Sequence, residues 1–362
     1  REFPDSPLAD RFTKNFEDII NDLEIRVVVE VMGGLNPAYD FVKRCLKAGK
    51  SVVTSNKELV AAHGAELLEI SKETNTNFLF EASVGGGIPI IRPLCQCLAA
   101  NYIEGIAGIL NGTTNFILTM MIEKGMSFDE ALKIAQEKGY AEKDPTADVE
   151  GHDACRKVCI LASLAFGKHV YPNQVETEGI TNITLEDVSY IENAGGVIKL
   201  LGQIKYINDN EIAAFVSPAV VYNGSQLASV KDVFNAILVR GDAVGDVCFY
   251  GPGAGKLPTA SAVVADIIDC AKHSERKKIF GWGAGNEDYV VDYKERIEMP
   301  FYVRAKATPA EINAKFSDVK FLSRKGQPSD EVAFITDIMT ENKLNKKLDG
   351  INVINTIKVT NY

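Results

Sequence analysis

The first third of the chain alternates between short apolar segments and longer amphipathic ones, and this alternation constrains the fold more than any other feature. Ile25 to Glu30, Ser51 to Thr54 and Asn77 to Glu81 have the apolar character of buried parallel strands. Between them, Asn36 to Ala48 and Lys57 to Thr74 repeat their apolar residues with the period of a helix. This order with short connections predicts an α/β fold, a doubly wound parallel sheet of the Rossmann type.

Glycine and polar residues follow each of these predicted strands. The clusters are Gly33-Gly34, Thr54 to Lys57 (TSNK) and Glu81 to Gly87 (EASVGGG). Ligands of doubly wound sheets bind beyond the carboxyl ends of the strands, where glycine permits close backbone approach and helix N-termini favour anions. Each cluster alone could be a flexible turn, but three at successive strand ends indicate a binding site.

The middle of the chain predicts a further sheet. Ile103 to Leu110 is a strand that ends in Asn111 to Asn115 (NGTTN), the start of a helix. Alternating segments between Ile180 and Tyr250 predict a sheet that covers the substrate site, with a helix at Asn193 to Leu201. Gly251 to Gly255 then precedes a helix to Ala271, and this turn is equally consistent with an anion site and with a tight packing joint.

The last part of the chain has a separate pattern of strands and helices. Four segments are strand-like, Met299 to Ala307, Val319 to Ser323, Glu331 to Ile338 and Ile351 to Thr360, and two are helical, Pro309 to Lys315 and Glu341 to Leu348. Their β-α-β-β-α-β order predicts a small ferredoxin-like domain.

A charged stretch from Asp144 to Lys157 runs into a predicted helix. Asp153 and Lys157 lie one turn apart at the margin of its apolar stripe, so they would face a groove or a neighbouring element. The alternative for this pair alone is an ion pair on a wet helix surface.

Composition excludes several classes of protein. The net charge is -10 and the 39 lysines and arginines form no basic stripe, which argues against nucleic-acid binding. Seven cysteines fit reduced thiols in a cytoplasmic protein, and the four histidines have no cysteine at zinc-ligand spacing. We expect no membrane association, because no signal peptide and no apolar run of about 18 residues is present.

Seven ordered motifs together resemble one enzyme family, homoserine dehydrogenase. They span about Ile25 to Lys272 and read EVMGG, TSNK, EASVGGGIPI, GILNGTTN, GYAEKDPTADVEGHDACRK, VFNAILVRGDAVG and FYGPGAGKLPTASAV. The C-terminal part resembles, more weakly, the ACT-type regulatory domain of some members. The resemblance implies NADH- or NADPH-dependent reduction of L-aspartate 4-semialdehyde to L-homoserine, on the route to threonine and methionine, by a homodimer or homotetramer.

The resemblance also implies roles for individual residues. Hydride attack on an aldehyde develops an alkoxide that needs a proton donor or a cation, and Lys57 and Lys157 match the family's two catalytic lysines. The substrate-binding positions are matched by Thr113, Tyr140, Glu142, Asp148, Asp153 and Lys157. Cofactor-binding positions are matched by Gly33, Gly34, Thr54, Ser55, Asn56, Lys57, Gly253 and Gly255. A monovalent cation site, for sodium, is matched by the backbone carbonyls of Glu81, Val84, Gly86 and Ile88.

From this resemblance we divide the chain into three domains. Residues 1–112 form a nucleotide-binding domain completed by 251–275, residues 113–250 form an α+β domain for substrate binding, catalysis and dimerisation, and residues 290–362 form the ACT-like domain.

The sequence departs from the family pattern in two places. The family's first strand and its G-x-G-x-x-G fingerprint, about 60 residues, are not present, and we expect them to lie outside this sequence. The choice between NAD and NADP is therefore open. Ala305 to Pro309 replaces the D-x-P-G turn of ACT domains, so feedback by threonine is an expectation only.

Two other functions are compatible with the pattern. One is a dehydrogenase of the same fold for another small amino acid or hydroxy acid, which would not need Glu142, Asp148, Asp153 and Lys157 together. The other is an amino-acid sensor without activity, against which the intact Lys57 and Lys157 argue.

Overall fold

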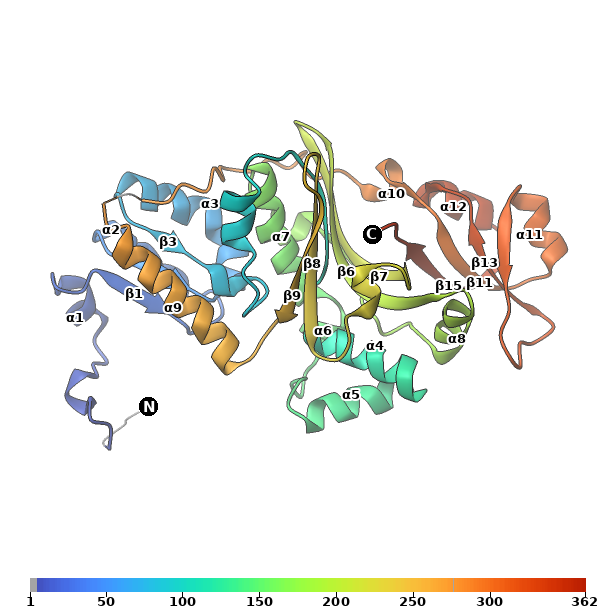
Figure 1. Ribbon diagram of the computed structural model, residues 1–362, viewed down its shortest axis with the longest axis horizontal. Coiled ribbons are helices and arrows are strands. Elements are labelled where there is room, and N and C mark those ends of the chain that lie inside the picture. The colour runs from blue at the N-terminus through green and yellow to red at the C-terminus, as the bar shows by residue number, and fades with distance from the viewer. Residues whose placement is uncertain (1–4, 276) are drawn as a thin grey trace.

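The computed structural model describes residues 5–275 and 277–362 and arranges the chain in three parts along its longest axis (Figure 1). The N-terminal part and helix α9 lie at one end, a large sheet with its helices lies in the middle, and the C-terminal part lies at the other end. In the described part of the chain, no helix is both long and apolar enough to span a bilayer.

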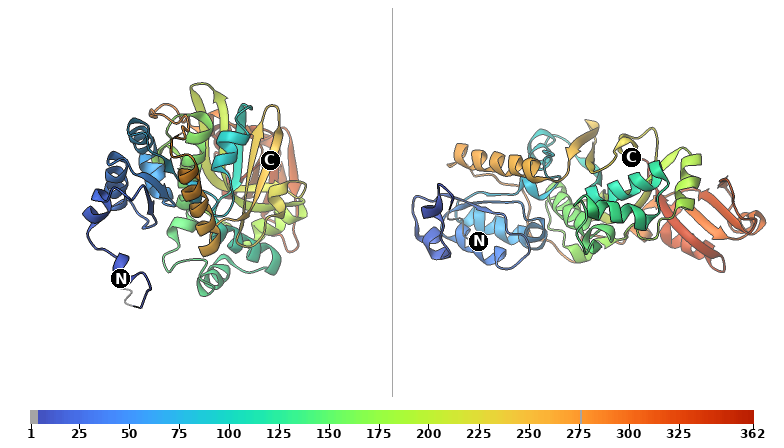
Figure 2. Two further views of the ribbon diagram at one scale, coloured as in Figure 1. Left: turned by 60° about the vertical axis from the view of Figure 1, so that its left-hand side comes forward. Right: turned by 90° about the horizontal axis from the view of Figure 1, so that it is seen from below.

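The N-terminal part confirms the predicted doubly wound arrangement. Strands β1 (Val27–Glu30), β2 (Ser51–Thr54) and β3 (Phe78–Leu79) pair in parallel in that order. Helices α2 (Ala38–Lys47) and α3 (Lys57–Glu73) cover one face. Helix α9 (Lys256–Lys272), which is distant in sequence, covers the other face of this sheet (Figure 2). Its residues Val263 and Cys270 pack there against Val53 and Leu79.

Strand β3 is shorter than the predicted segment Asn77 to Glu81. Glu81 instead begins a 3-10 turn, η2 (Glu81–Ser83), because its carboxylate turns back to accept hydrogen bonds from the backbone N–H groups of Ile90 and Ile91. The first residues of a helix carry such unsatisfied N–H groups. Before α2 the chain forms η1 (Ala9–Arg11) and α1 (Phe16–Asn21), and after η2 it forms a π-turn, η3 (Pro93–Cys97).

The central part is an antiparallel sheet with its α-helices on one face. Its strands run in the order β7-β6-β4-β8-β9. They are β4 (Ile103–Ile109), β6 (Gly196–Asn208), β7 (Glu211–Tyr222), β8 (Phe234–Gly241) and β9 (Gly245–Pro252), with β5 (Glu176–Thr177) beside β7. The helices are α4 (Gly112–Lys124), α5 (Phe128–Glu137), α6 (Thr146–Val149), α7 (His152–Phe166), α8 (Leu185–Asn193), η4 (Pro172–Gln174) and η5 (Gln226–Ser229).

The predicted helix at Asn193 to Leu201 is wrong. Helix α8 ends at Asn193, Gly195 turns the chain with a φ of 83°, and strand β6 begins at Gly196. The error arose because β6 is buried on both faces at Ile198 to Ile204, so its sequence lacks the alternation that identifies a strand with one wet face.

The C-terminal part confirms the ferredoxin-like prediction. Its sheet has the order β12-β13-β11-β15, and the elements follow as β-α-β-β-α-β. They are β11 (Phe301–Lys306), α11 (Pro309–Lys315), β12 (Val319–Leu322), β13 (Glu331–Thr336), α12 (Glu341–Leu348) and β15 (Asn352–Val359), joined by α10 (Tyr293–Arg296), β10 (Glu298–Met299) and β14 (Met339–Thr340).

The ferredoxin-like sheet continues into the central sheet, which the sequence did not predict. Lys358 and Val359 of β15 pair in parallel with Ala219 and Val220 of β7, so the two parts share one ten-stranded sheet. Side chains reinforce the junction, since the Tyr302 hydroxyl donates to Asp187 of α8 at 2.9 Å. The ferredoxin-like part is therefore fixed to the central sheet.

The segment between α9 and the C-terminal part is held by a buried tryptophan. The Trp282 indole N–H donates to Nδ1 of His169 at 3.0 Å, and a Cβ added to Gly64 of α3 would lie 2.7 Å from the Trp282 ring. Burial of His169 lowers the pKa of its imidazole from 6.5 to about 4.

This histidine should make the protein less stable in acid. An unfolded imidazole binds a proton more readily than the folded one, so the free energy of unfolding should fall as the pH drops from 6.5 towards 4. The contribution is about 3 kcal/mol, because burial lowers the pKa from 6.5 to about 4 and a tenfold change in proton affinity is worth about 1.4 kcal/mol. Denaturant unfolding of the wild type and of His169→Gln, across this range, should show the extra loss only in the wild type; parallel curves would contradict the assignment.

Candidate functional site

A cleft of about 670 Å³ lies where the N-terminal and central parts meet. Its walls come from the carboxyl end of β2, the turn after β3, the start of α4, the loop before α6, the start of α7 and the turn before α9. Among its lining residues are the predicted Ser55, Lys57, Gly86, Thr113, Tyr140, Glu142, Asp148, Asp153, Lys157, Gly253 and Gly255. The structure thus brings most of the predicted substrate and cofactor positions to one cleft.

The centre of this cleft is an ionic cluster around Asp153. Lys57 Nζ lies 2.9 Å from Asp153 Oδ1, and Lys157 Nζ lies 2.7 Å from Asp153 Oδ2. Lys57 is the first residue of α3 in the N-terminal part, whereas Asp153 and Lys157 stand one turn apart on α7 in the central part. The cluster therefore joins the N-terminal side of the cleft to its central side.

The pair Asp153 and Lys157 is buried, which excludes an ion pair on a wet helix surface. The side chains are about one-tenth exposed, 9% for Asp153 and 10% for Lys157. Lys157 also donates to the carbonyl of Leu110, at the end of β4, at 2.6 Å. Lys57 differs, because 40% of its side chain is exposed to the cleft.

Burial and mutual attraction set the charge states in the cluster. Burial opposes ionisation of Asp153, but the ammonium groups of Lys157 and Lys57 outweigh it and hold the pKa of Asp153 well below its ordinary value. Burial lowers the pKa of Lys157, although Asp153 opposes this. For Asp148, burial and the charge of Asp153 raise the pKa, while a hydrogen bond from Asn111 opposes the rise. The cluster thus combines a firmly ionised carboxylate with an ammonium group that gives up its proton more easily than usual.

Asn111 belongs to the site and was missed as a site residue from the sequence. Its side-chain oxygen caps α4 by accepting from the backbone N–H of Thr114 at 2.8 Å. Its amide nitrogen donates to Asp148 at 2.7 Å and to Asp153 at 2.9 Å. The sequence signalled only the cap, because the second role depends on α7 lying beside the start of α4.

The neighbouring polar positions are held by the loop that precedes α6. Thr113 donates its hydroxyl to the carbonyl of Tyr140 at 2.7 Å, and the Tyr140 ring packs edge-on against Phe116 of α4. Tyr140 remains 43% exposed at the cleft, and Glu142 follows it there. These groups line the same cleft as Lys57.

The predicted cofactor positions near β1 make hydrogen bonds and turns within the N-terminal part and are not among the residues that line the cleft. Gly33 and Gly34 form a turn with φ of 78° and 70°. Asn56 caps α3 and donates to the carbonyl of Gly34 at 2.7 Å, and buried Thr54 donates to Glu30 at 2.6 Å. Thr54 and Asn56 therefore lie beneath this glycine turn and shape it.

The two glycine-rich turns of the cleft touch each other. A Cβ on Gly86 would lie 2.4 Å from the carbonyl oxygen of Gly253, and the N–H of Gly87 donates to the carbonyl of Pro252 at 3.1 Å. The turn at 251–255 is thus a tight packing joint, and its exposed surface lines the cleft at the start of α9. Glu81, Val84 and Ile88 are buried in and beside the other turn.

Comparison with known proteins assigns these features to a family. Residues 89–268 match the family described as homoserine dehydrogenase, and residues 7–81 match the homoserine dehydrogenase NAD binding domain. The chain is 47% identical over 260 residues to a homoserine dehydrogenase from Synechocystis, a match that covers 71% of this chain and 60% of that protein. A homoserine dehydrogenase from Bacillus subtilis is 45% identical over 261 residues, covering 72% of this chain and 60% of that relative. The matched part thus spans about 60% of these relatives' length.

Solved structures agree over nearly the whole chain. The crystal structure of a homoserine dehydrogenase from Thiobacillus denitrificans has a TM-score of 0.85 at 38% identity, covering 96% of this chain and 85% of that one. That of S. aureus has a TM-score of 0.79 at 33% identity, covering 97% and 85%. Fold and site together define a protein with a Rossmann-type NAD-binding domain. The chain belongs to the homoserine dehydrogenase family.

Proposed function

We propose that the protein is a homoserine dehydrogenase, an NAD(P)-dependent oxidoreductase that reversibly converts L-aspartate 4-semialdehyde and L-homoserine. The observation that carries this proposal is the convergence of the Lys57 and Lys157 ammonium groups on Asp153 in the cleft. Reduction of an aldehyde needs positive charge and a proton at the developing alkoxide, and two ammonium groups supply both.

Substrate recognition follows from the acidic side of the cleft. The amino-acid end of the substrate carries an ammonium group, and Asp148 and Glu142 line the cleft with Asp153 nearby. We assign the substrate ammonium to these carboxylates, with Thr113 and Tyr140 as polar neighbours. The aldehyde would then point towards Lys57 and Lys157.

The two lysines suit different parts of the reaction. A bound dihydronicotinamide would supply the hydride. Lys57, exposed to the cleft at the end of β2, stabilises negative charge on the substrate oxygen. Lys157, whose pKa burial lowers, releases a proton more readily, directly or through water. This division places charge stabilisation on α3 and proton supply on α7.

Membership of the family leads us to propose a nicotinamide cofactor and a bound monovalent cation. An archaeal homoserine dehydrogenase mutant in complex with NADPH, 31% identical and with a TM-score of 0.62, supports NADPH or NADH as the reductant. Sodium would be held by the backbone carbonyls of Glu81, Val84, Gly86 and Ile88. Carbonyl oxygens suit a hard cation, and these four residues stand on one turn beside the cleft.

Assembly, regulation and location are further parts of the proposal. We propose a homodimer or homotetramer, with the ferredoxin-like part acting as an ACT-type domain that responds to threonine. The seven cysteines are free thiols, which supports a reducing compartment such as the cytoplasm.

A substrate panel tests the assignment of substrate. L-homoserine should support reduction of NADP or NAD, whereas L-serine, L-threonine and 4-hydroxybutyrate should support far less. The carboxylates explain the low activity expected with 4-hydroxybutyrate, because it lacks the ammonium group. L-serine and L-threonine keep that group but carry the hydroxyl one carbon closer to it than L-homoserine does. Equal activity with 4-hydroxybutyrate would contradict the proposed roles of Asp148 and Glu142.

A further inference from the structure

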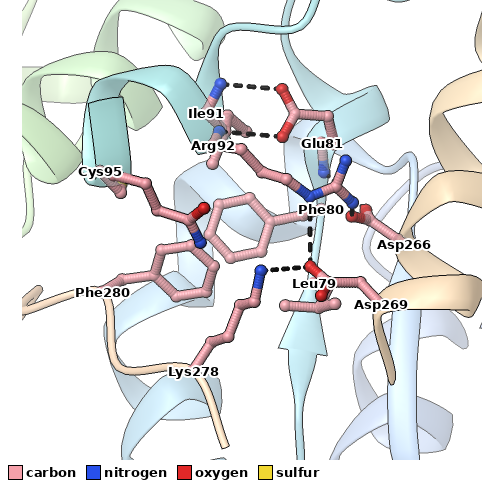
Figure 3. A pocket seen from close by; sticks show the side chains of 11 residues that line it. Leu79, Phe80, Glu81, Ile91, Arg92, Cys95, Asp266, Asp269, Lys278 and Phe280 are labelled. Carbon is pink, nitrogen blue, oxygen red and sulfur yellow. Dashed lines mark hydrogen bonds and ion pairs between the residues drawn. The ribbon is translucent and has the colours of Figure 1, made fainter. Parts of the chain in front are cut away.

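A second ionic cluster lies between the segment after β3 and helix α9. Figure 3 shows Glu81 and Arg92 from the segment after β3 facing Asp266 and Asp269 of α9, with Lys278 alongside. None of these side chains belongs to the proposed reaction, so their arrangement needs another explanation.

Glu81 closes the segment that carries the glycine turn. Its carboxylate accepts hydrogen bonds from the backbone N–H groups of Ile90 and Ile91 at 2.8 Å and of Arg92 at 3.0 Å. The start and the end of the segment 81–92 are thereby held together. Between them lies the turn whose residues Ala82, Ser83 and Gly86 line the cleft.

Asp266 ties this closed segment to α9. One carboxylate oxygen accepts from the backbone N–H of Glu81 at 2.8 Å, and the other pairs with the guanidinium of Arg92. The side chain is 2% exposed, and burial raises its pKa to about 7. Both carboxylate oxygens of Asp266 therefore contact the segment 81–92, one at each of its ends.

The glycine turn at 251–255 leads directly into the same helix, α9. Helix α9 begins at Lys256, directly after Gly253 to Gly255, and Asp266 lies ten residues further, about 15 Å along a helix. At the cleft the two turns meet backbone to backbone at Gly86 and Gly253, with no room for a side chain. The position of α9 relative to the segment 81–92 therefore determines how closely the turn at Gly86 packs against the turn at Gly253.

We propose that Asp266 is a positioning residue for the nicotinamide end of the cofactor. By fixing α9 on the closed segment 81–92, it holds the two glycine turns in the relative position that the cofactor requires. This inference rests on the proposed function, because the turns have this role only if a nicotinamide cofactor binds in the cleft.

Asp269 supplies a matched control from the same helix. It accepts from Arg92 Nε at 3.2 Å and from His273 Nδ1 at 2.7 Å, and it pairs with Lys278. Of the two aspartates, Asp266 is the one that accepts the hydrogen bond from the backbone N–H of Glu81. Asp269→Asn thus weakens the same ionic cluster and leaves the grip on Glu81 intact.

The test compares Asp266→Asn with Asp269→Asn. An amide has one acceptor oxygen where the carboxylate uses two, so Asp266→Asn must lose either Glu81 or Arg92. We expect the KM for the nucleotide to rise roughly 10-fold or more and kcat to fall less. Hydrogen exchange at the backbone amides of 82–88 and 253–257 should accelerate. For Asp269→Asn, KM should stay within about twofold at a comparable melting temperature.

Three results decide the inference. Equal KM and equal exchange in the two variants would overturn it and reduce Asp266 to a structural ion pair. If Asp266→Asn does not fold, Arg92→Met replaces it, because it removes the guanidinium that pairs with Asp266 and Asp269→Asn already controls for the contact of Arg92 with Asp269. The same direction is expected in KM and exchange, and wild-type values would overturn the inference. If the wild type itself lacks activity, the proposed function fails, while the exchange comparison still decides whether Asp266 couples the two turns.

Discussion

Lys57→Met should lower turnover by roughly 100- to 10,000-fold and leave the melting temperature almost unchanged. The ammonium group of Lys57 reaches the cleft, 40% of its side chain is exposed, and it forms an ion pair with Asp153 at 2.9 Å. Methionine keeps the length of the side chain and removes its charge. The measurement is kcat at saturating substrate and nucleotide, with a thermal melt of the same preparation.

Arg156→Met is the matched control for this substitution. Arg156 is also a cation that lines the cleft, but it pairs with Glu58 at 3.5 Å and not with the central carboxylate. Its loss should change kcat by less than about tenfold. A Lys57→Met protein as active as this control would show that Lys57 contributes only charge to the surface of the cleft.

Lys157→Met should lower turnover about as much as Lys57→Met does. It should also lower the free energy of unfolding by about 3 kcal/mol. The added cost arises because Lys157 is buried and donates to both Asp153 and the Leu110 carbonyl, so its loss leaves buried acceptors with fewer partners. Asp153 keeps Lys57 and Asn111, which limits the cost. Denaturant unfolding measures the loss of stability, and kcat at a temperature where both proteins are folded measures the chemistry.

The pH dependence separates the two lysines. If Lys157 supplies the proton, aldehyde reduction falls as the pH rises through its pKa, which burial places below the usual 10.5. Lys57→Met should retain this alkaline limb at reduced rate, whereas Lys157→Met should lose it. An unchanged limb in Lys157→Met would assign the proton to another group.

Most of the fold was predictable because the relevant signals are local. The apolar runs at β1 and β2 and the β-α-β-β-α-β order at the C-terminus are set by residues adjacent in sequence. Strand β6 was misread as a helix because burial on both faces removes its alternation. The pairing of β15 with β7 joins segments far apart in sequence and leaves no periodic signal.

The candidate site likewise combines residues that local motifs identify with contacts that only the folded chain shows. The lysines and acids of the cleft stand in motifs, and the structure gathers them around Asp153. Asn111 reads as a helix cap in sequence, and its contact with Asp153 requires the packing of α4 on α7. The bond between Glu81 and Asp266 spans 185 residues, so only the folded chain reveals it.

We propose that the cleft around Asp153 reduces L-aspartate 4-semialdehyde. The most direct measurement follows the absorbance of NADPH and of NADH while purified protein is mixed with this aldehyde, with product identified by chromatography. We expect aldehyde-dependent oxidation of at least one nucleotide, with L-homoserine as the product, and we expect Lys57→Met to lose this oxidation. Folded wild-type protein that binds nucleotide but forms no L-homoserine would contradict it.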